Sequence, residues 1–303
     1  MAVTAWLFPG QGSQYVGMAA EWAERDERAR ALVARADRIL GFPLSEVMFR
    51  GPEQELRQTR NTQPAIFLHS MIAVTLLAGE PPAMAAGHSL GEYTALVAAG
   101  ALSFEDGLRL VRLRGELMQR AGETAPGTMA AVVGLEPAGV EAVCREASAA
   151  GIVQPANFNA PGQVVISGSV DGVHRAMELA KQRGAKMVKE LVVSGAFHSP
   201  LMQSAQEGLR TALGATRFTD ARLPVYTNVQ AEPVTRAEEI RALLLAQLTS
   251  PVRWEELVRH MARDGARRFL EVGPGKVLQG LVRRIEPTAE LSGIDRYADL
   301  PKD

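Results

Sequence analysis

The pentapeptide GHSLG, residues 87–91, constrains the fold strongly because it follows a run of small apolar residues and has the pattern G-x-S-x-G. A sharp turn from a strand into a helix brings backbone segments so close that residues two positions from its centre cannot carry a Cβ atom. Such a turn presents the central hydroxyl, here that of Ser89, at a helix N-terminus whose free N–H groups stabilise negative charge. Because glycine and serine are common in turns, an ordinary turn stays open as the alternative.

The composition is that of an ordinary globular chain. The 303 residues, of which 47% are hydrophobic, can bury a large core as one large domain or two unequal ones. A formal net charge of -1 gives no overall field that would favour nucleic acid or an anionic membrane as a partner. The single cysteine, Cys144, excludes an internal disulfide, and neither a signal-peptide pattern nor a bilayer-spanning apolar run occurs. These observations predict a cytoplasmic protein in which Cys144 packs inside a helix.

Strands that alternate with helices predict a layered α/β architecture with a largely parallel sheet. The expected elements are strands over 4–8, 223–228 and 267–273, and helices over about 18–40, 64–77 and 104–121. Ser103 is the expected N-cap of the last of these helices. The tail from Glu286 is short and polar, and we expect it to lie at the surface.

Between residues 125 and 194 the expected elements become shorter and follow the order β-α-β-β-α-β. This order is that of a ferredoxin-like subdomain, and its last strand is expected over 186–193. Asn159 lies in the expected turn 159–162 between the two middle strands, which suits its conformational tolerance. We therefore expect a small subdomain, 125–194, inserted into a larger one formed by 1–124 and 195–303. A cleft between subdomains is a common site of ligand binding.

A serine hydroxyl is a weak nucleophile and needs a base, most often a histidine that folding brings near. His198 lies between an expected strand and a helix whose N-cap is Ser199 and whose first residue is Pro200. Strand-end loops of this kind often carry catalytic side chains, although a structural histidine is the alternative. Of the other four histidines, His88 lies at the serine turn, where adjacent side chains diverge. His69, His174 and His260 lie within helical patterns.

Arg114 is expected to point into the core because its neighbours three and four positions away are Leu110, Val111, Leu117 and Met118. A buried guanidinium needs an anionic partner, since removing one partner of a buried ion pair costs roughly 3–5 kcal/mol. The partner is either an acidic residue of the chain or a carboxylate on the substrate, which arginine binds through two parallel hydrogen bonds.

The loop FPGQGSQ, residues 8–14, offers closely spaced N–H donors. It does not fit the dinucleotide-binding pattern, because Tyr15 replaces the third glycine, or the P-loop, because Met18 replaces its lysine. A better use is half of an oxyanion hole, in which the N–H of Gln11 pairs with that of Leu90, with a plain turn as the alternative.

Two glutamines, Gln63 and Gln247, lie near expected helix ends among apolar neighbours, where either could simply satisfy backbone groups. We expect no metal site, because the sequence contains no cysteine pair, no H-E-x-x-H and no Asp-rich calcium loop.

The motifs FPGQGSQ, GHSLGEY, GAFHS and EVGPGKVLQGLV occur in this order, with Arg114 between the second and third. With them the chain, over essentially its whole length, resembles the malonyl-CoA:acyl-carrier-protein transacylases of fatty-acid and polyketide synthesis. The resemblance implies an α/β-hydrolase-like large subdomain with a ferredoxin-like small one, which agrees with the order of elements above. It also implies that Ser89 is the nucleophile and His198 the base.

The resemblance implies further roles around this pair. Gln11 and Leu90 would be the oxyanion donors, and Arg114 would hold the free carboxylate of malonate. Gln247 falls where the family uses a backbone carbonyl to orient the histidine. The acyl group would lie against Gln63, Met118 and Phe197. Phe197 resembles the bulky residue that leaves no room for a methyl group at the malonyl α-carbon, which favours malonyl over methylmalonyl.

The implied reaction transfers malonyl from malonyl-CoA to the phosphopantetheine thiol of an acyl carrier protein through a malonyl-serine, without a cofactor. A serine esterase or thioesterase shares the serine and the base, but one for neutral acyl chains has no use for a buried arginine. A patatin-like lipase would need a catalytic aspartate in a turn, and the aspartates of the Asp-Gly pairs in this chain, Asp106, Asp171 and Asp264, fall in helical or terminal patterns. A carrier-docking module with a dead site stays open as an alternative. We expect a freestanding monomer whose candidate carrier-binding rim is Lys181, Arg183, Lys186, Lys189, Arg283 and Arg284.

Overall fold

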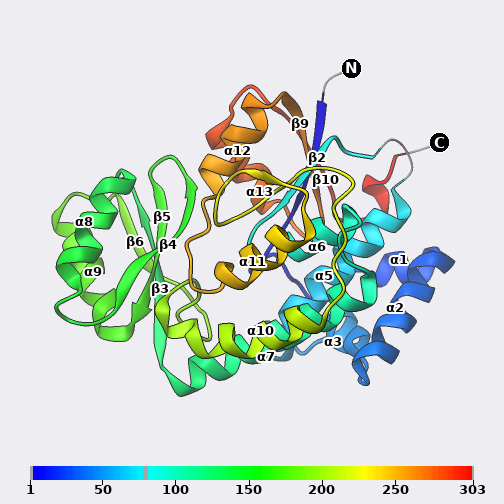
Figure 1. Cartoon of the computed structure of the whole chain (residues 1–303), viewed down its shortest axis with the longest axis horizontal. Coiled ribbons are helices and arrows are strands. Elements are labelled where there is room, and N and C mark those ends of the chain that lie inside the picture. Colours follow the sequence, from blue (N-terminus) through cyan, green and yellow to red (C-terminus); the bar gives the residue numbers. More distant parts are fainter. Residues whose placement is uncertain (1–2, 78–80, 302–303) are drawn as a thin grey trace.

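The computed structural model describes residues 3–77 and 81–301 of the chain. The expectation of a freestanding chain rests partly on Met1, which lies outside the described residues. Figure 1 shows a larger unit beside a smaller one, drawn in green at the left, which residues 127–190 form. Each unit is built on its own sheet.

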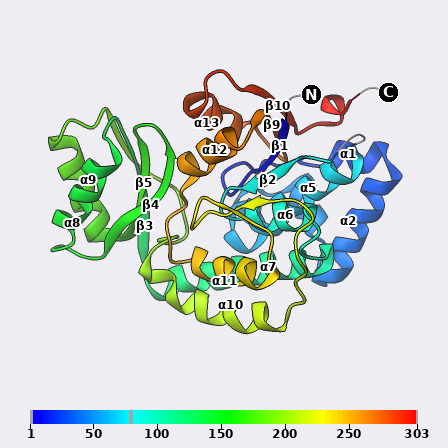
Figure 2. The ribbon, with the colours of Figure 1, turned by 45° about the horizontal axis from the view of Figure 1, so that its top comes forward.

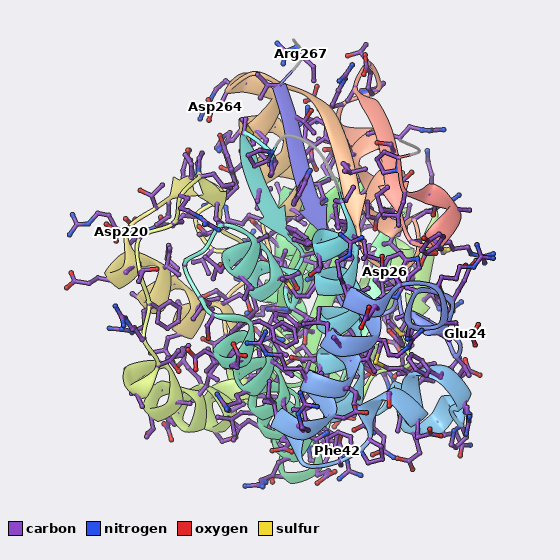
Figure 3. The ribbon with its side chains drawn as sticks, turned by 90° about the vertical axis from the view of Figure 1, so that its right-hand side faces the viewer. Glu24, Asp26, Phe42, Asp220, Asp264 and Arg267 are labelled. Atoms are coloured by element: carbon purple, nitrogen blue, oxygen red, sulfur yellow. The ribbon has the colours of Figure 1, made fainter. Side chains whose placement is uncertain are left out.

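Within the described residues, the larger sheet has six strands, of which β10 through β7 pair in parallel and β8 pairs antiparallel with β7. From one edge to the other they are β10 (Glu290–Ile294), β9 (Ala266–Val272), β1 (Val3–Phe8), β2 (Met84–Gly87), β7 (Val225–Tyr226) and β8 (Pro233–Val234). In Figure 3 the labelled Asp264 and Arg267 mark the end of the sheet at which β9 begins. The parallel strands run from there to the opposite end. The predicted α/β fold class with a largely parallel sheet is confirmed.

Helices cover both faces of this sheet because alternate residues of its strands point to opposite sides. Ala5 and Leu7 of β1 pack in one apolar cluster with helices α12 (Trp254–Arg263) and α13 (Val277–Ile285). Phe8 packs in another cluster, with helices α5 (Thr59–Leu76) and α6 (Gly91–Ala98). The helices of the larger unit are α1 (Ala20–Arg25), α2 (Glu27–Leu40), α3 (Leu44–Arg50), α4 (Glu53–Arg57), α5 (Thr59–Leu76), α6 (Gly91–Ala98), α7 (Phe104–Thr124), α10 (Gln203–Ala215), α11 (Ala237–Gln247), α12 (Trp254–Arg263) and α13 (Val277–Ile285), with the 3-10 helices η1 (Pro200–Met202) and η2 (Tyr297–Asp299).

The smaller unit has the predicted order β-α-β-β-α-β. Its elements are β3 (Gly127–Val133), α8 (Pro137–Ala147), β4 (Val153–Ala160), β5 (Gln163–Ser169), α9 (Val170–Gln182) and β6 (Met187–Glu190). The strands lie in the order β4-β5-β3-β6, and every neighbouring pair is antiparallel. Figure 2 shows α8 and α9 on the face of this sheet that points away from the larger unit, where Cys144 is buried. The boundaries of the two subdomains stay a prediction.

Several expected elements differ in extent from those in the structure. The helix expected over 18–40 is two helices, because Asp26 between them has an extended backbone and its carboxylate caps α2 by accepting the N–H of Arg28. The polar tail contains β10, an edge strand in which only Ile294 is buried, which is why it lacks a strong apolar pattern. The expected cap of α7 is confirmed, since the Ser103 hydroxyl accepts the N–H of Asp106.

The helix expected from Pro64 onward begins earlier, at Thr59, and carries the proline in its interior. A proline there has no N–H to give to the carbonyl four residues before it, which is that of Arg60. The guanidinium of Arg112 donates to this carbonyl instead, at 3.0 Å, so the missing helical hydrogen bond is replaced. The last strand of the smaller unit is shorter than expected, because β6 pairs with β3 only over residues 187–190.

Candidate active site

Ser89 lies at the sharp turn between the end of β2 and the start of α6, at the C-terminal end of the parallel strands. Its φ angle is 52°, a left-handed conformation that is uncommon for a residue other than glycine. A Cβ atom on Gly87 would lie 1.8 Å from the backbone carbon of Gly91, and one on Gly91 would lie 2.0 Å from the carbonyl oxygen of Phe8. The turn therefore has the crowding that the G-x-S-x-G pattern predicts.

Replacing Gly91 by alanine is expected to lower the free energy of unfolding by about 3 kcal/mol or more, because backbone atoms cannot move aside as a side chain can. Gly214 in α10 is the matched control, since a Cβ atom there would meet nothing within 4 Å. Gly214→Ala should leave stability unchanged or raise it by up to about 1 kcal/mol. Urea unfolding of the two variants measures the difference, and equal midpoints would contradict the crowding.

His198 and Ser89 face each other although 109 positions separate them in the sequence, and the serine Oγ lies 2.8 Å from the histidine Nε2. The other ring nitrogen, Nδ1, lies 2.9 Å from the backbone carbonyl oxygen of Gln247. A carbonyl oxygen can only accept, so Nδ1 carries the proton of the neutral ring. Nε2 is then free to accept the proton of the serine hydroxyl.

His198 is held in place by its own backbone as well as by its ring. It precedes η1, with a φ angle of 57°, and the Ser199 side chain caps η1 by accepting the N–H of Leu201. The backbone carbonyl oxygen of His198 accepts a hydrogen bond from the side chain of Gln154, on β4 of the smaller unit, at 2.9 Å. Burial, followed by the charge of Arg114, lowers the pKa of His198 to about 3. The ring is therefore neutral near pH 7 and able to accept a proton.

Arg114 on α7 is 1% exposed, as its apolar helix neighbours predict, and its guanidinium lies against Ser89. One guanidinium nitrogen donates to the side-chain oxygen of Gln63 at 2.9 Å, and the other donates to Ser89 Oγ at 3.0 Å and to the side-chain oxygen of Gln247 at 2.9 Å. These partners are neutral, and the guanidinium forms no ion pair with any residue that the structure describes. Burial lowers its pKa, but an arginine side chain stays charged in proteins. A cation is thus available for an anionic ligand beside the hydroxyl.

The Gln11 loop packs next to the serine turn and lines the same cavity as Ser89 and His198. Gly10 packs against the carbonyl of His88, since a Cβ atom there would lie 2.5 Å from that oxygen. The Gln11 side chain donates to the hydroxyl of Thr59. Within the described part of the chain, the backbone N–H groups of Gln11 and Leu90 have no hydrogen-bond acceptor. Both are therefore free to bind an oxygen atom of a ligand.

A cavity of about 130 Å³ opens beside Ser89. This is well below the roughly 300 Å³ at which pockets for drug-sized ligands begin, so the cavity suits a small group. The residues predicted for the site that line it are Gln11, Gln63, Ser89, Leu90, Arg114, Met118, Phe197 and His198. Gln247 lies behind them, fully buried.

Five further lining residues are absent from the sequence prediction: His88, Met129, Asn157, Leu191 and Val193. Except for His88, they lie on β3 and β4 or in the segment after β6, so only the docking of the smaller unit brings them to the cavity. Their sequence surroundings are ordinary strand patterns and carried no signal. His88 could have been suspected from its position next to the serine.

The interpretation of Asn159 as a turn residue is wrong. It belongs to β4, and its side-chain oxygen lies 2.8 Å from Nε2 of His88. The turn that follows is tighter, because β4 continues to Ala160 and β5 starts at Gln163. This contact ties the smaller unit to the serine turn, and burial lowers the pKa of His88, so the bonded ring is neutral.

No helix in the described ranges has both the length and the apolar character needed to cross a membrane. In the same ranges, no three histidine, cysteine, aspartate or glutamate side chains come together as metal ligands could.

A model of the acyl transferase domain family matches residues 5–301. The chain belongs to the acyl transferase family. Among its curated relatives, the malonyl CoA-acyl carrier protein transacylase of Bacillus subtilis (strain 168) is 46% identical over 288 residues, covering 94% of this chain and 91% of that protein. The predicted resemblance is therefore confirmed, and with it the prediction of an acyltransferase enzyme.

Solved structures agree with this assignment. The malonyl CoA-acyl carrier protein transacylase from Coxiella burnetii has a TM-score of 0.96 at 38% identity, covering 98% of this chain and 95% of that one. A malonyl-transacylase solved in complex with a type II PKS acyl-carrier protein has a TM-score of 0.95 at 40% identity, covering 98% and 97%. The family's mixed α/β fold is thus shared over nearly the whole chain.

Proposed function

We propose that this enzyme transfers a malonyl group from malonyl-CoA to the phosphopantetheine thiol of an acyl carrier protein through a malonyl ester of Ser89. The observation that carries the proposal is the buried guanidinium of Arg114, which has only neutral partners and lies 3.0 Å from the serine Oγ. A free carboxylate on the acyl group would supply the directly bound anion that this cation lacks. The names of the relatives support the same substrate and acceptor.

In the first step, Nε2 of His198 accepts the Ser89 proton as Oγ attacks the thioester carbonyl carbon. The carbonyl oxygen becomes negative and accepts hydrogen bonds from the N–H groups of Gln11 and Leu90, each worth about 2.7–4 kcal/mol in comparable sites. The carbon–sulfur bond then breaks, and the imidazolium returns its proton to the thiolate of coenzyme A. The carbonyl of Gln247 keeps Nδ1 protonated throughout.

The second step repeats the chemistry with the carrier thiol as nucleophile. His198 accepts the thiol proton, the sulfur attacks the ester carbonyl, and the same two N–H groups hold the oxygen. The bond to Ser89 Oγ breaks, and the imidazolium gives its proton back to the serine. The net exchange consumes no cofactor and leaves the enzyme unchanged.

We propose that the residues lining the cavity select the acyl group. Arg114 and Gln63 would orient the malonyl carboxylate, and Gln63 is itself held by a contact of its amide with the sulfur of Met118 at 3.2 Å. Phe197 lines the cavity beside the base, and we propose that it excludes a methyl group at the malonyl α-carbon.

The carrier protein is expected to approach through a basic rim. Two of the candidate cations are already engaged within the chain, because Arg183 pairs with Glu146 and Arg284 donates to Gln163 and the carbonyl of Pro161. The exposed remainder is Lys181, Lys186, Lys189 and Arg283. A monomer in the cytoplasm stays part of the proposal, as does a role in fatty-acid or polyketide synthesis.

Mass spectrometry of the intact protein after incubation with malonyl-CoA or acetyl-CoA tests the proposal. We expect a malonyl increment that maps to the peptide containing Ser89 and is absent in Ser89→Ala, and we expect far less acetyl increment. Adding a phosphopantetheinylated carrier protein should discharge the adduct onto the carrier faster than water does. Faster loss to water would favour the alternative, a serine thioesterase or esterase for acidic acyl substrates. No adduct at all would favour a docking module with a dead site.

A further inference from the structure

Glu92 lies in the first turn of α6, three positions after the serine, and is 1% exposed. In the described ranges, only one other carboxylate, Glu271, is buried as deeply. An oxygen of the Glu92 carboxylate accepts the backbone N–H of Asn228 at 3.0 Å and the side-chain N–H of Gln247 at 2.9 Å. The mechanism above gives this carboxylate no step.

Both partners of Glu92 contact the reacting groups. Gln247 binds three of them: its side-chain oxygen accepts from Arg114, its side-chain nitrogen donates to the carbonyl of Ser89 at 3.0 Å, and its backbone carbonyl accepts from His198. Asn228 accepts the Ser89 N–H at 2.6 Å through its side-chain oxygen and donates to the carbonyl of Gly87 at 2.7 Å. Glu92 is thus one hydrogen bond away from the groups that orient the nucleophile, the base and the cation.

The carboxylate determines which way the Gln247 amide faces. A carboxylate only accepts, so it selects the NH₂ end of the amide and turns the oxygen end toward Arg114, which only donates. The reversed amide would set oxygen against carboxylate and NH₂ against guanidinium. The negative charge of Glu92 and the positive charge of Arg114 thus lie at opposite ends of one amide, in a buried region where charges interact strongly.

We propose that Glu92 is a positioning residue that orients Gln247 and offsets the charge of Arg114, so that His198 stays basic enough to deprotonate Ser89. This inference rests on the proposed function, because the step it assists is acylation of the serine. The charged or titratable groups that face Glu92 are Arg114 on α7, the adjacent Tyr93 and, beyond Gln247, the neutral ring of His198. Arg114 lowers the pKa of His198, so a carboxylate that balances Arg114 preserves the basicity of the imidazole.

A pH profile separates this role from a purely structural one. Burial raises the pKa of Glu92 to about 7, whereas that of His198 is lowered to about 3. As the pH falls through about 7, Glu92 becomes neutral, the charge of Arg114 is no longer balanced, and serine reactivity should fall. A fluorophosphonate reports this reactivity without an ionisable group of its own, since it modifies the serine directly.

The experiment compares wild type, Glu92→Gln and the control Glu271→Gln. Glu271 accepts the N–H groups of Leu278 and Gln279 at the start of α13, and burial raises its pKa as well, but it contacts none of the site residues. We expect Glu92→Gln to lower kcat for malonyl transfer by about 10- to 100-fold without raising KM, a smaller loss than the roughly 10²- to 10⁴-fold that a general base itself contributes. Fluorophosphonate labelling should slow by a similar factor and lose its dependence on pH near 7. Glu271→Gln should lower the melting temperature but keep the wild-type kcat and pH profile.

A Glu92→Gln variant with kcat within about twofold of wild type and an unchanged pH profile would overturn the inference. If that variant does not fold, the wild-type labelling profile decides alone, because a flat profile between pH 6 and 8 contradicts a role for the Glu92 charge. Failure of the proposed function is recognised separately, by the absence of a malonyl adduct on wild-type Ser89. Labelling by the fluorophosphonate needs no malonyl group and still tests Glu92 in that case.

Discussion

Replacing His198 by alanine is expected to slow formation of the acyl-serine by about 10²- to 10⁴-fold, the range that a positioned general base contributes. The variant loses the Nε2 atom that lies 2.8 Å from Ser89 Oγ, so the hydroxyl must attack without giving up its proton to a neighbouring base. The ring is buried, but the two groups that it contacts keep other partners: Ser89 Oγ still accepts from Arg114, and the carbonyl of Gln247 still accepts the N–H of Ser250. We therefore expect the variant to fold. Rapid-quench measurement of malonyl-enzyme formation, followed by mass spectrometry, gives the rate.

His174→Ala is the matched control for this substitution. His174 lies on α9 of the smaller unit, its side chain is 50% exposed, and its contact is with Glu190. We expect the rate of acylation in this variant to equal that of wild type. Acylation in His198→Ala at a rate close to that of His174→Ala would show that another group accepts the serine proton, and the mechanism would then need a different base.

Replacing Arg114 by glutamine is expected to lower kcat/KM for malonyl-CoA by about 150- to 5000-fold, since leaving a buried charge unpaired costs roughly 3–5 kcal/mol. In the variant the unpaired charge is the carboxylate of the bound malonyl group. Acetyl-CoA has no such carboxylate, so its kcat/KM should change by less than about tenfold. The ratio of the two values measures the contribution of the guanidinium to selection of the acyl group.

Arg109→Gln is the matched control on the same helix. The side chain of Arg109 is 59% exposed and lies 3.8 Å from Asp106, a contact worth little at the surface. Selectivity in this variant should match that of wild type. A malonyl preference that survives in Arg114→Gln would mean that other groups recognise the carboxylate. The buried guanidinium of Arg114 would then no longer support the proposed function.

Some properties of this protein follow from local sequence because their causes are local. The crowding at Gly87 comes from the backbone of Gly91 and Glu92, which follow in the same turn, and the cap at Ser103 depends on a side chain and an N–H three positions apart. The inward direction of Arg114 follows from helical periodicity alone. The order of strands and helices, and with it the fold class, could therefore be predicted without coordinates.

Other expectations failed where a distant partner replaces a local one. Pro64 lies inside a helix because Arg112 donates to the carbonyl that the proline leaves without a hydrogen bond. Asn159 lies in β4, which pairs with β5, and its side chain bonds to the distant His88. Neither partner can be recognised from the residues adjacent in sequence, since the contacts depend on how helices and strands pack.

By itself the sequence determined the strained serine turn, the buried arginine and the succession of elements, since backbone sterics and side-chain periodicity act over a few residues. Only the tertiary structure decided which atoms meet: that the carbonyl of Gln247 binds His198, and that the carboxylate of Glu92 faces inward to Gln247. Every residue has a backbone carbonyl, so the sequence does not indicate which carbonyl binds the histidine. An acidic residue in the first turn of a helix is ordinarily exposed. Such contacts arise when α6, α11 and the loop before η1 pack together, so their cause is the arrangement of the whole chain.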